Sequence, residues 1–226
     1  MKTLVIIPAR GGSKGIPKKN IKNFCGKPLI YYSIDIARQL VEDDDICIST
    51  DDSEIIDCVK NYGLNVPFIR PSELSNDTAT TNDVLLHALD YYSRGLSKKY
   101  DTILLLQPTS PLRTIESVKE ALNLFRFEYD MVVSVKESHV ASVLCEEKQN
   151  GRLKMIFNKD LQGRQQFGKF YEYNGAVYVI NVDSLMSTKM GQFENVVKFL
   201  MAEEESIDID TLLDWIIAEA IHNNKN

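Results

Sequence analysis

Short runs of consecutive aliphatic residues recur along the chain, and longer segments with a different periodicity separate them. A continuous apolar run rich in Val, Ile and Leu is typical of a strand that is buried on both faces of a sheet. The pattern predicts strands at residues 3–7, 46–49, 66–69, 102–106, 131–135 and 176–180.

Between these runs, apolar residues recur at the spacing of three and four that marks one face of a helix. Residues 28–40 show it with Ile30, Ile34, Ala37 and Leu40, after a proline at the start. Asp52 or Ser53 is expected to cap a second helix that stops at Gly63. Further helices are expected at 81–92, 114–127 and 210–222, the last with an apolar stripe formed by Leu212, Leu213, Trp215, Ile216, Ile217, Ala220 and Ile221.

Single helices between successive strands indicate βαβ units. The predicted fold is therefore α/β, with a mostly parallel sheet flanked by helices. Right-handed crossovers place the loops that follow the strands along one edge of such a sheet, where ligands usually bind.

Residues 136–172 interrupt this pattern, because they are polar, irregular and too long for an ordinary connection in a compact domain. We interpret them as an arm inserted into a single domain that spans residues 1–226.

Composition narrows the class of protein. The chain has 226 residues, 44 % of them hydrophobic, and a formal net charge of −6, which argues against nucleic acid as the main partner. It contains no apolar run long enough to span a membrane. The cysteines lack metal-binding spacing and are expected to be reduced residues of a cytoplasmic protein: Cys25, Cys47, Cys58 and Cys145.

Positive charge is concentrated at the start of this acidic chain. The first 34 residues contain seven Lys or Arg and no Asp or Glu, and most of these cations lie near the glycine-rich loop 8–20. Such a loop directly after a buried strand predicts a polyphosphate site, since its backbone N–H groups and cations offset negative charge. The loop matches neither the G-x-x-x-x-G-K-[ST] spacing of the Walker P-loop nor the spacing G-x-G-x-x-G. The alternative, a disordered basic tail, fits poorly with the four aliphatic residues that precede the loop.

Three further segments carry polar groups that the expected fold places at or near the same edge. Arg70 follows a predicted strand and suits a carboxylate or a phosphate. Gln107 ends the most apolar strand and offers both a donor and an acceptor. Asp208 and Asp210 alternate with isoleucines, so both point to one side of an extended segment and suit a hard divalent cation. In the alternative interpretation, Asp210 caps the last helix and Asp208 is exposed.

Together these motifs resemble the acylneuraminate cytidylyltransferase family, which includes the bacterial enzymes for legionaminic and pseudaminic acid. The resemblance runs end to end. It rests on Pro-Ala-Arg-Gly-Gly-Ser-Lys-Gly with Lys-Asn at 8–20, Arg-Pro-x-Glu-Leu with Asp-Thr-Ala at 70–79, Leu-Gln-Pro-Thr-Ser-Pro-Leu-Arg at 106–113, Arg-Gln-Gln at 164–166, Asn-Gly-Ala-x-Tyr at 174–178 and Ile-Asp-Ile-Asp at 207–210.

The resemblance implies roles for particular residues. Triphosphate contacts would come from Arg10, Ser13, Lys14 and Lys19. Pyrimidine, ribose or sugar contacts would come from Asn20, Arg70, Thr81 and Gln107, with Asn174 and Tyr178 also on the substrate side. Asp208 and Asp210 would bind Mg²⁺ or Mn²⁺, and Asp210 would also help to orient or deprotonate the attacking hydroxyl. The arm would cross to the partner in a homodimer and bring Arg164 and Gln165 to the sugar.

The implied reaction joins CTP to a nine-carbon 2-keto acid sugar and releases pyrophosphate. Sialic-acid-specific relatives can carry a lysine near the position aligned with Ser142, so the choice among such sugars stays open. Other interpretations are a cytidylyltransferase for the eight-carbon sugar Kdo, a glycosyltransferase on a similar sheet, and a non-catalytic CTP-binding protein.

Overall fold

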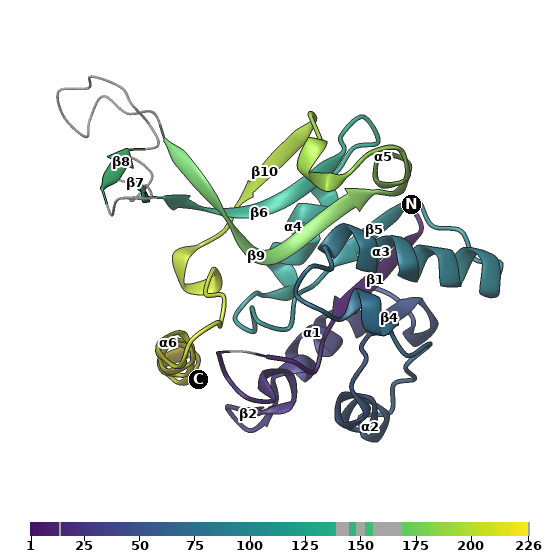
Figure 1. Cartoon of the computed structure of the whole chain (residues 1–226), viewed down its shortest axis with the longest axis horizontal. Coiled ribbons are helices and arrows are strands. Elements are labelled where there is room, and N and C mark those ends of the chain that lie inside the picture. The colour runs from purple at the N-terminus through teal and green to yellow at the C-terminus, as the bar shows by residue number, and fades with distance from the viewer. Residues whose placement is uncertain (14, 139–144, 148–151, 156–168, 226) are drawn as a thin grey trace.

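The computed structural model describes the whole chain except residues 14, 139–144, 148–151, 156–168 and 226. The predictions for Lys14, Ser142, Arg164 and Gln165 therefore concern residues outside the described part. Within the described part, the main element is a six-stranded sheet in the order β10-β6-β9-β5-β1-β4 (Figure 1). Its strands are β1 (Thr3–Pro8), β4 (Ile46–Ser49), β5 (Thr102–Leu105), β6 (Met131–Ser138), β9 (Phe170–Asn181) and β10 (Val196–Leu200).

The prediction of a mostly parallel sheet is confirmed, with one antiparallel strand in the middle. β1 pairs in parallel with β4 and β5, and β10 pairs in parallel with β6. β9 runs antiparallel to both β5 and β6. Because of this reversal, β9 enters the sheet at the edge where β5 and β6 end, with Phe170 beside Ser138 of β6 and Tyr178 beside Leu105 of β5. The site was expected at this edge.

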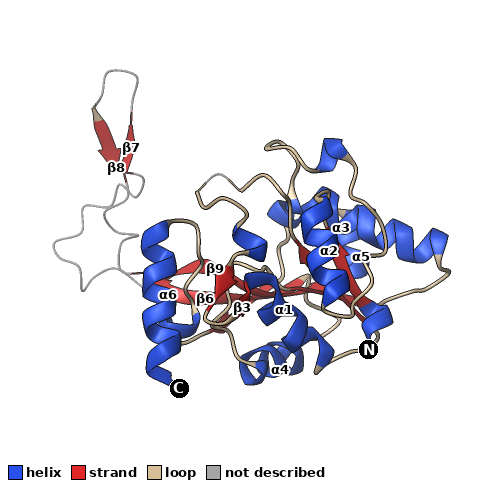
Figure 2. Cartoon of the chain, turned by 90° about the horizontal axis from the view of Figure 1, so that it is seen from below, coloured by secondary structure: helices blue, strands red, loops and turns tan. Residues whose placement is uncertain are grey.

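Helices cover both faces of the sheet, since alternate residues of its strands point to opposite sides. In β1, Val5 and Ile7 pack with α1 (Leu29–Arg38), α2 (Ser53–Asn61) and α4 (Ile115–Leu124). Leu4 and Ile6 pack on the other face, with α3 (Thr81–Asp90) and α5 (Val182–Ser187). Figure 2 shows α1 and α4 on one side of the sheet and α3 and α5 on the other.

Several boundaries follow from capping as expected. The Asp52 carboxylate accepts hydrogen bonds from the first backbone N–H groups of α2 and is its N-cap. The Gly63 backbone has a φ of 78°, in the left-handed region that suits a glycine just after a helix. Thr80 and Asp83 form a reciprocal capping box at the start of α3, which continues into the π-helical turn η4 (Tyr91–Gly95).

One strand prediction was wrong, and one strand was missed. The segment 66–69 forms only an isolated bridge between Ile69 and Thr50, and the Ile69 side chain is exposed. Conversely, β10 was not predicted, because its side chains are at most partly buried and its sequence lacks a long aliphatic run. As an edge strand it needs only one neighbour.

The stretch 136–172 is more regular at its ends than its polar sequence indicated. β6 and β9 continue their ladder into it, pairing Lys136 with Glu172 and Ser138 with Phe170. Within it, β7 (Cys145–Glu147) and β8 (Leu153–Met155) pair with each other. Figure 1 shows β7 and β8 apart from the main sheet.

The last helix, α6 (Leu212–Lys225), buries only a small part of the apolar stripe that its sequence predicted. Trp215 and Ala218 are buried in a third cluster with Phe24 and Ile209. The rest of the stripe is largely exposed. The exposed members include Leu212, Leu213, Ile216 and Ile217.

The predictions on membrane-spanning segments and on the cysteines can also be compared with the described residues. No described helix has the length and apolarity needed to cross a membrane. Cys25, Cys47 and Cys58 are free thiols, of which Cys47 lies in the core and the other two are partly exposed. The side chain of Cys145 lies outside the described part.

Candidate active site

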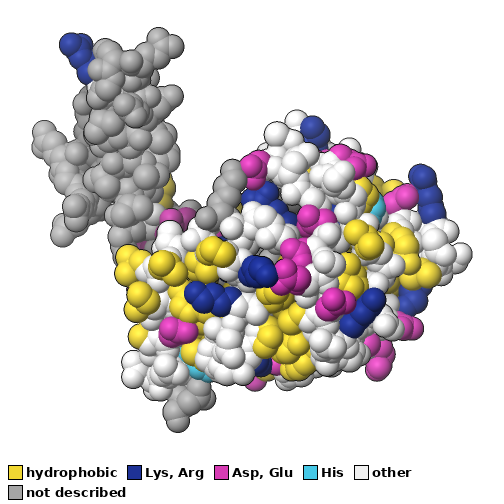
Figure 3. All heavy atoms as spheres, turned by 60° about the horizontal axis from the view of Figure 1, so that its bottom comes forward, with side chains coloured by type: hydrophobic (Ala, Val, Ile, Leu, Met, Phe, Trp, Pro, Cys, Tyr) yellow, Lys and Arg dark blue, Asp and Glu magenta, His cyan; other side chains and the backbone are white. Residues whose placement is uncertain are grey.

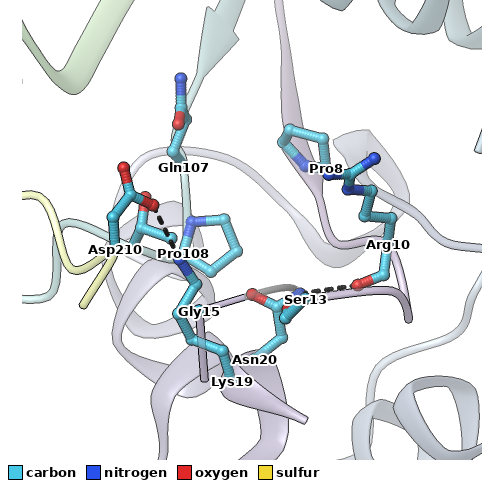
Figure 4. Close-up of a pocket in the computed structure, with 10 residues that line it drawn as sticks. Pro8, Arg10, Ser13, Gly15, Lys19, Asn20, Gln107, Pro108 and Asp210 are labelled. Atoms are coloured by element: carbon cyan, nitrogen blue, oxygen red, sulfur yellow. Dashed lines mark hydrogen bonds and ion pairs between the residues drawn. The ribbon is translucent and has the colours of Figure 1, made fainter. Parts of the chain in front are cut away.

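A cavity of about 410 Å³ lies at the carboxyl ends of β1 and β5. Three segments that are far apart in the sequence line it: the basic loop, the segment after β5 and the acidic segment before α6 (Figure 4). Its lining residues are Pro8, Arg10, Ser13, Gly15, Lys19, Asn20, Gln107, Pro108, Thr109 and Asp210.

A second cavity of about 240 Å³ shares Pro8 and Arg10 with the first. The remaining walls come from the segment 70–84, including Arg70 and Thr81. Arg10 thus borders two adjacent compartments, which is the arrangement that a substrate made of two linked parts requires.

Close backbone approach explains two glycines of the basic loop. A Cβ atom on Gly15 would lie 2.1 Å from the carbonyl oxygen of Asp210, so only glycine lets the loop reach the acidic segment. A Cβ on Gly11 would lie 2.3 Å from Oδ2 of Asp52, the N-cap of α2. The Asn20 amide then fixes the loop from inside by donating to the Arg10 carbonyl at 3.1 Å. These contacts hold the loop against both α2 and the acidic segment.

Described cations of the loop are paired with carboxylates. Lys19 is buried and its Nζ donates to the Ile209 carbonyl and to Oδ1 of Asp210, the latter at 3.0 Å. Arg10 forms an ion pair of 2.9 Å with Asp77. Basic and acidic side chains lie side by side over this part of the surface (Figure 3). An incoming polyphosphate would therefore compete with carboxylates for these cations.

Arg70 is the most enclosed cation of the second cavity. Only 5 % of its surface is exposed, and its Nη2 lies 3.5 Å from Oδ1 of Asp51. Burial lowers the pKa of the guanidinium, and the Asp51 carboxylate partly offsets that effect. Its Nε has no hydrogen-bond partner among the described residues. Arg70 therefore keeps one enclosed donor without a partner in this part of the chain.

The acidic segment is held beside the segment after β5 by a backbone hydrogen bond of 2.8 Å from Ile209 N–H to the Thr109 carbonyl. Ile207 and Ile209 face the cluster beneath α6, so Asp208 and Asp210 face the opposite side, as the alternation predicted. Burial raises the pKa of the Asp208 carboxyl; the nearby Thr109 hydroxyl opposes that effect, and the Asp210 charge adds a smaller increase.

The alternative interpretation of these aspartates was wrong. Thr211, not Asp210, is reciprocally hydrogen-bonded with Asp214 at the start of α6. Asp208 is also not exposed, since its Oδ1 is enclosed and has no hydrogen-bond partner in the described part of the chain.

These two carboxylates fit a divalent cation that takes its other ligands from a substrate. No group of three or more His, Cys, Asp or Glu able to hold a metal occurs among the described residues. Mg²⁺ is commonly held by one or two carboxylates together with substrate phosphates, and an enclosed, unpaired carboxylate oxygen is a suitable ligand. Asp208 and Asp210 meet this requirement.

The structure brings most of the predicted residues together. Six lie in the first cavity (Arg10, Ser13, Lys19, Asn20, Gln107 and Asp210) and two in the second (Arg70 and Thr81). Asp208, Asn174 and Tyr178 are not among the residues that line either cavity. Burial raises the pKa of Tyr178 to about 12, with a smaller effect of the Asp208 charge.

Asn174 instead stabilises an irregularity in β9. Val133 and Val135 of β6 pair with Tyr178 and Tyr173, so the residues between them bulge out of register. The Asn174 carbonyl accepts from the Ser134 hydroxyl and the Ala176 N–H, and its amide donates to Ser206. Asn174 therefore ties this bulge to the acidic segment.

Sequence analysis missed Asp77 and Arg113. Asp77 holds Arg10 at the border between the cavities, but it precedes a threonine-rich turn and looks like an ordinary turn residue. Arg113 was noted only as the end of a motif, yet it is buried directly behind Gln107. Its sequence neighbours gave no signal of this burial, because the partners of Arg113 come from three separate segments.

The fold and the site define the class of protein: a nucleotide-binding α/β protein whose cationic loop faces a pair of carboxylates. The fold matches the solved structure of CMP:2-keto-3-deoxy-manno-octonic acid synthetase complexed with CTP. The TM-score is 0.72 at 17 % identity, and the match covers 100 % of both chains.

A family model described as cytidylyltransferase matches residues 4–206, and the chain belongs to this family. The chain is 33 % identical to CMP-N,N'-diacetyllegionaminic acid synthase of Legionella pneumophila, covering 98 % of this chain and 96 % of the relative. It is 32 % identical to pseudaminic acid cytidylyltransferase of Campylobacter jejuni, covering 98 % and 97 %. It is also 32 % identical to N-acylneuraminate cytidylyltransferase of Escherichia coli, of which it spans 53 %.

Proposed function

We propose that this cytidylyltransferase joins CTP to a nine-carbon 2-keto acid sugar and releases the CMP-sugar and pyrophosphate. The observation that carries the proposal is the convergence of Arg10, Lys19, Gln107 and Asp210 from three separate segments on one cavity, with a second compartment beside Arg10. The names of the relatives support the choice of sugar, since three of them act on acids of this class.

The reaction needs an in-line attack of the anomeric hydroxyl of the sugar on the α-phosphorus of CTP. An O–P bond forms, the bond to the β-phosphate oxygen breaks, and the hydroxyl proton leaves to a base. Lys19 and Arg10 would bind the phosphate oxygens on which charge develops, and the rigid placement of Lys19 is suited to this. In other enzymes, removing one preorganised donor to a developing negative charge raises the activation free energy by about 2.7–4 kcal/mol.

Asp208 and Asp210 would hold Mg²⁺ or Mn²⁺ together with phosphate oxygens of CTP. The ion, when bound, would neutralise charge on the triphosphate. Asp210 is the more exposed of the two at the mouth of the cavity, so it would also orient the sugar hydroxyl or accept its proton.

Selectivity for cytosine would come from amide and hydroxyl groups. Asn20 and Gln107 line the first cavity and Thr81 the second, and such groups can pair with the donor and acceptor edge of the base. A site that leaves buried polar groups unpaired can reject a wrong substrate by about 10⁴-fold.

A homodimer would complete the sugar site, with the arm 136–172 delivering Arg164 and Gln165 from the partner. The surface of α6 supports self-association, since Leu212, Leu213 and Ile216 are more than half exposed. Hydrophobic side chains also gather on the α6 side of the molecule (Figure 3). An arginine fork is well suited to the carboxylate of a 2-keto acid sugar.

The test is pyrophosphate release from purified protein mixed with Mg²⁺, one nucleotide and one sugar. CTP should react with at least one of N-acetylneuraminate, N,N'-diacetyllegionaminate and pseudaminate, and UTP, ATP and GTP should react far more slowly. The eight-carbon sugar Kdo is the informative control, because its synthetase shares the fold. Preference for Kdo would replace the proposal with the eight-carbon alternative, and CTP binding without pyrophosphate release in the presence of any of these sugars would favour a non-catalytic CTP-binding protein.

A further inference from the structure

Arg113 is a charged residue deep inside the protein that the proposed chemistry does not use. Only 3 % of its surface is exposed, and its guanidinium donates to acceptors on three different elements. Nη1 donates to the Ala176 carbonyl at 2.6 Å. Nη2 donates both to the Ser33 hydroxyl and to the Gln107 carbonyl.

The acceptors are neutral, so the guanidinium has no hydrogen-bonded carboxylate in the described part of the chain. Burial lowers the pKa of Arg113 to about 9, and the nearby Asp208 carboxylate opposes that effect. Enclosing a cation without a direct partner is costly, and an apolar residue of similar volume often packs better. Packing alone therefore gives no reason for an arginine here.

Nη2 of the guanidinium holds the backbone of Gln107 just after the end of β5. Ser33 in α1 adds to this contact, because its hydroxyl also lies 3.3 Å from the Gln107 carbonyl. The Gln107 side chain lines the first cavity on the other side of this backbone. Displacing the carbonyl would displace the amide that faces the nucleotide.

The second nitrogen of the guanidinium, Nη1, holds the bulge of β9 against Asp208. Gly175 precedes Ala176 and has a φ of +75°, and a Cβ on it would lie 3.0 Å from Oδ2 of Asp208. The bulge is thus one wall of the Asp208 site. Holding the Ala176 carbonyl keeps that wall at a set distance from Gln107.

We propose that Arg113 is a positioning residue that sets the Gln107 amide and the Asp208 carboxylate in register with each other. It touches neither substrate, and it acts through the backbone of Gln107 and the Gly175–Ala176 bulge. The inference rests on the proposed function for its kinetic consequences, but not for its effect on CTP binding.

The test uses Arg113→Lys, which keeps the charge but loses the two-armed geometry. Ser33→Ala is the milder variant, since it removes one acceptor and leaves the guanidinium in place. Ser49→Ala is the matched control, because Ser49 is also fully buried but its hydroxyl has no hydrogen-bond partner among the residues that the structure describes.

Two kinetic quantities that do not depend on the fraction of active protein are informative: the KM for CTP and the Mg²⁺ concentration at half-maximal rate. Arg113→Lys should raise both about tenfold and Ser33→Ala about threefold, as expected for weakened buried hydrogen bonds. Ser49→Ala should leave both unchanged. Calorimetric titration with CTP in EDTA should show weaker binding in the same order.

A merely structural role would lower kcat and thermal stability while both concentrations stay at the wild-type values, and that result would overturn the proposal. If Arg113→Lys does not fold, Ser33→Ala decides by the same criterion. If wild-type protein turns over none of the sugars, the proposed function fails separately. The titrations in EDTA then decide on Arg113, with unchanged CTP affinity in both variants as the overturning result.

Discussion

Lys19 and Asp210 lie 191 positions apart in the chain and form an ion pair of 3.0 Å at the cavity. The two partners differ in environment, since the Lys19 side chain is 11 % exposed and that of Asp210 is 75 % exposed. The buried ammonium also donates to the Ile209 carbonyl, which fixes it more firmly than the ion pair alone. The pair therefore joins the basic loop to the acidic segment and presents a cation and a carboxylate to the same space.

Lys19→Met should abolish most of the activity while leaving a folded protein. Loss of one fixed cation that acts on the leaving group is expected to cost about 10²–10³ in kcat. Lys18→Met is the control, because Lys18 belongs to the same loop but forms an exposed pair with Glu54. Pyrophosphate release at saturating CTP measures both. Equal losses in the two variants would show that the charge of the loop matters and the position of Lys19 does not.

Activity should require a divalent cation that Asp208 and Asp210 bind. EDTA should stop pyrophosphate release and added Mg²⁺ should restore it, whereas Asp208→Asn and Asp210→Asn should stay inactive at any Mg²⁺ concentration tested.

The same variants should fold. Burial raises the pKa of Asp208 in the folded state, so ionising this carboxyl costs more in the folded chain than in the unfolded chain and lowers stability as the pH rises. Asp208→Asn should therefore keep or raise the wild-type Tm in EDTA. Full activity in EDTA would contradict the metal assignment, and a collapse of Tm in Asp208→Asn would indicate a structural carboxylate.

Asp130 should make the stability of the protein depend on pH below about 4. The Ser184 hydroxyl and then the Asn195 backbone N–H donate to this carboxylate and lower its pKa. A lowered folded-state pKa means that the stabilisation is complete above the unfolded value of 3.8 and is lost as the pH falls through the folded value.

Because this carboxylate lies near the surface, where solvent screens its interactions, Asp130→Asn should reduce the free energy of unfolding in urea by about 0.5–1 kcal/mol at pH 7. The difference from wild type should shrink as the pH falls below 4. Asp57→Asn, at an exposed site on α2, is the control and should change little at either pH. A difference that stays constant with pH would rule out the carboxylate charge as its source.

The protein should form a homodimer that uses the exposed face of α6. Light scattering should give twice the chain mass of 25.7 kDa at micromolar concentration. Ile216→Glu should shift the mass toward that of one chain, because it places a charge in a face that association would bury. Met186→Glu is the control, since Met186 is equally exposed but lies on α5. A single-chain mass for the wild type would contradict the shared sugar site.

Much of the fold could be predicted because burial on both faces leaves a local signature. The core strands β1, β4, β5 and β6 are continuous aliphatic runs, and the caps at Asp52 and Thr80 mark helix starts through bonds to residues two or three positions away. The basic loop could be found in the same way, since glycines and cations after a buried strand are consecutive in the sequence.

Only the tertiary structure decided the features that depend on distant partners. The antiparallel placement of β9 between β5 and β6 arises from pairing across long loops, which no local periodicity records. The apolar residues of α6 have the same spacing whether a helix is buried or exposed, so their solvent-facing position had to be observed. Asp77 pairs with Arg10, 67 positions away, and Arg113 binds Ala176, 63 positions away, besides its near neighbour Gln107. The burial and function of such residues depend on those distant partners.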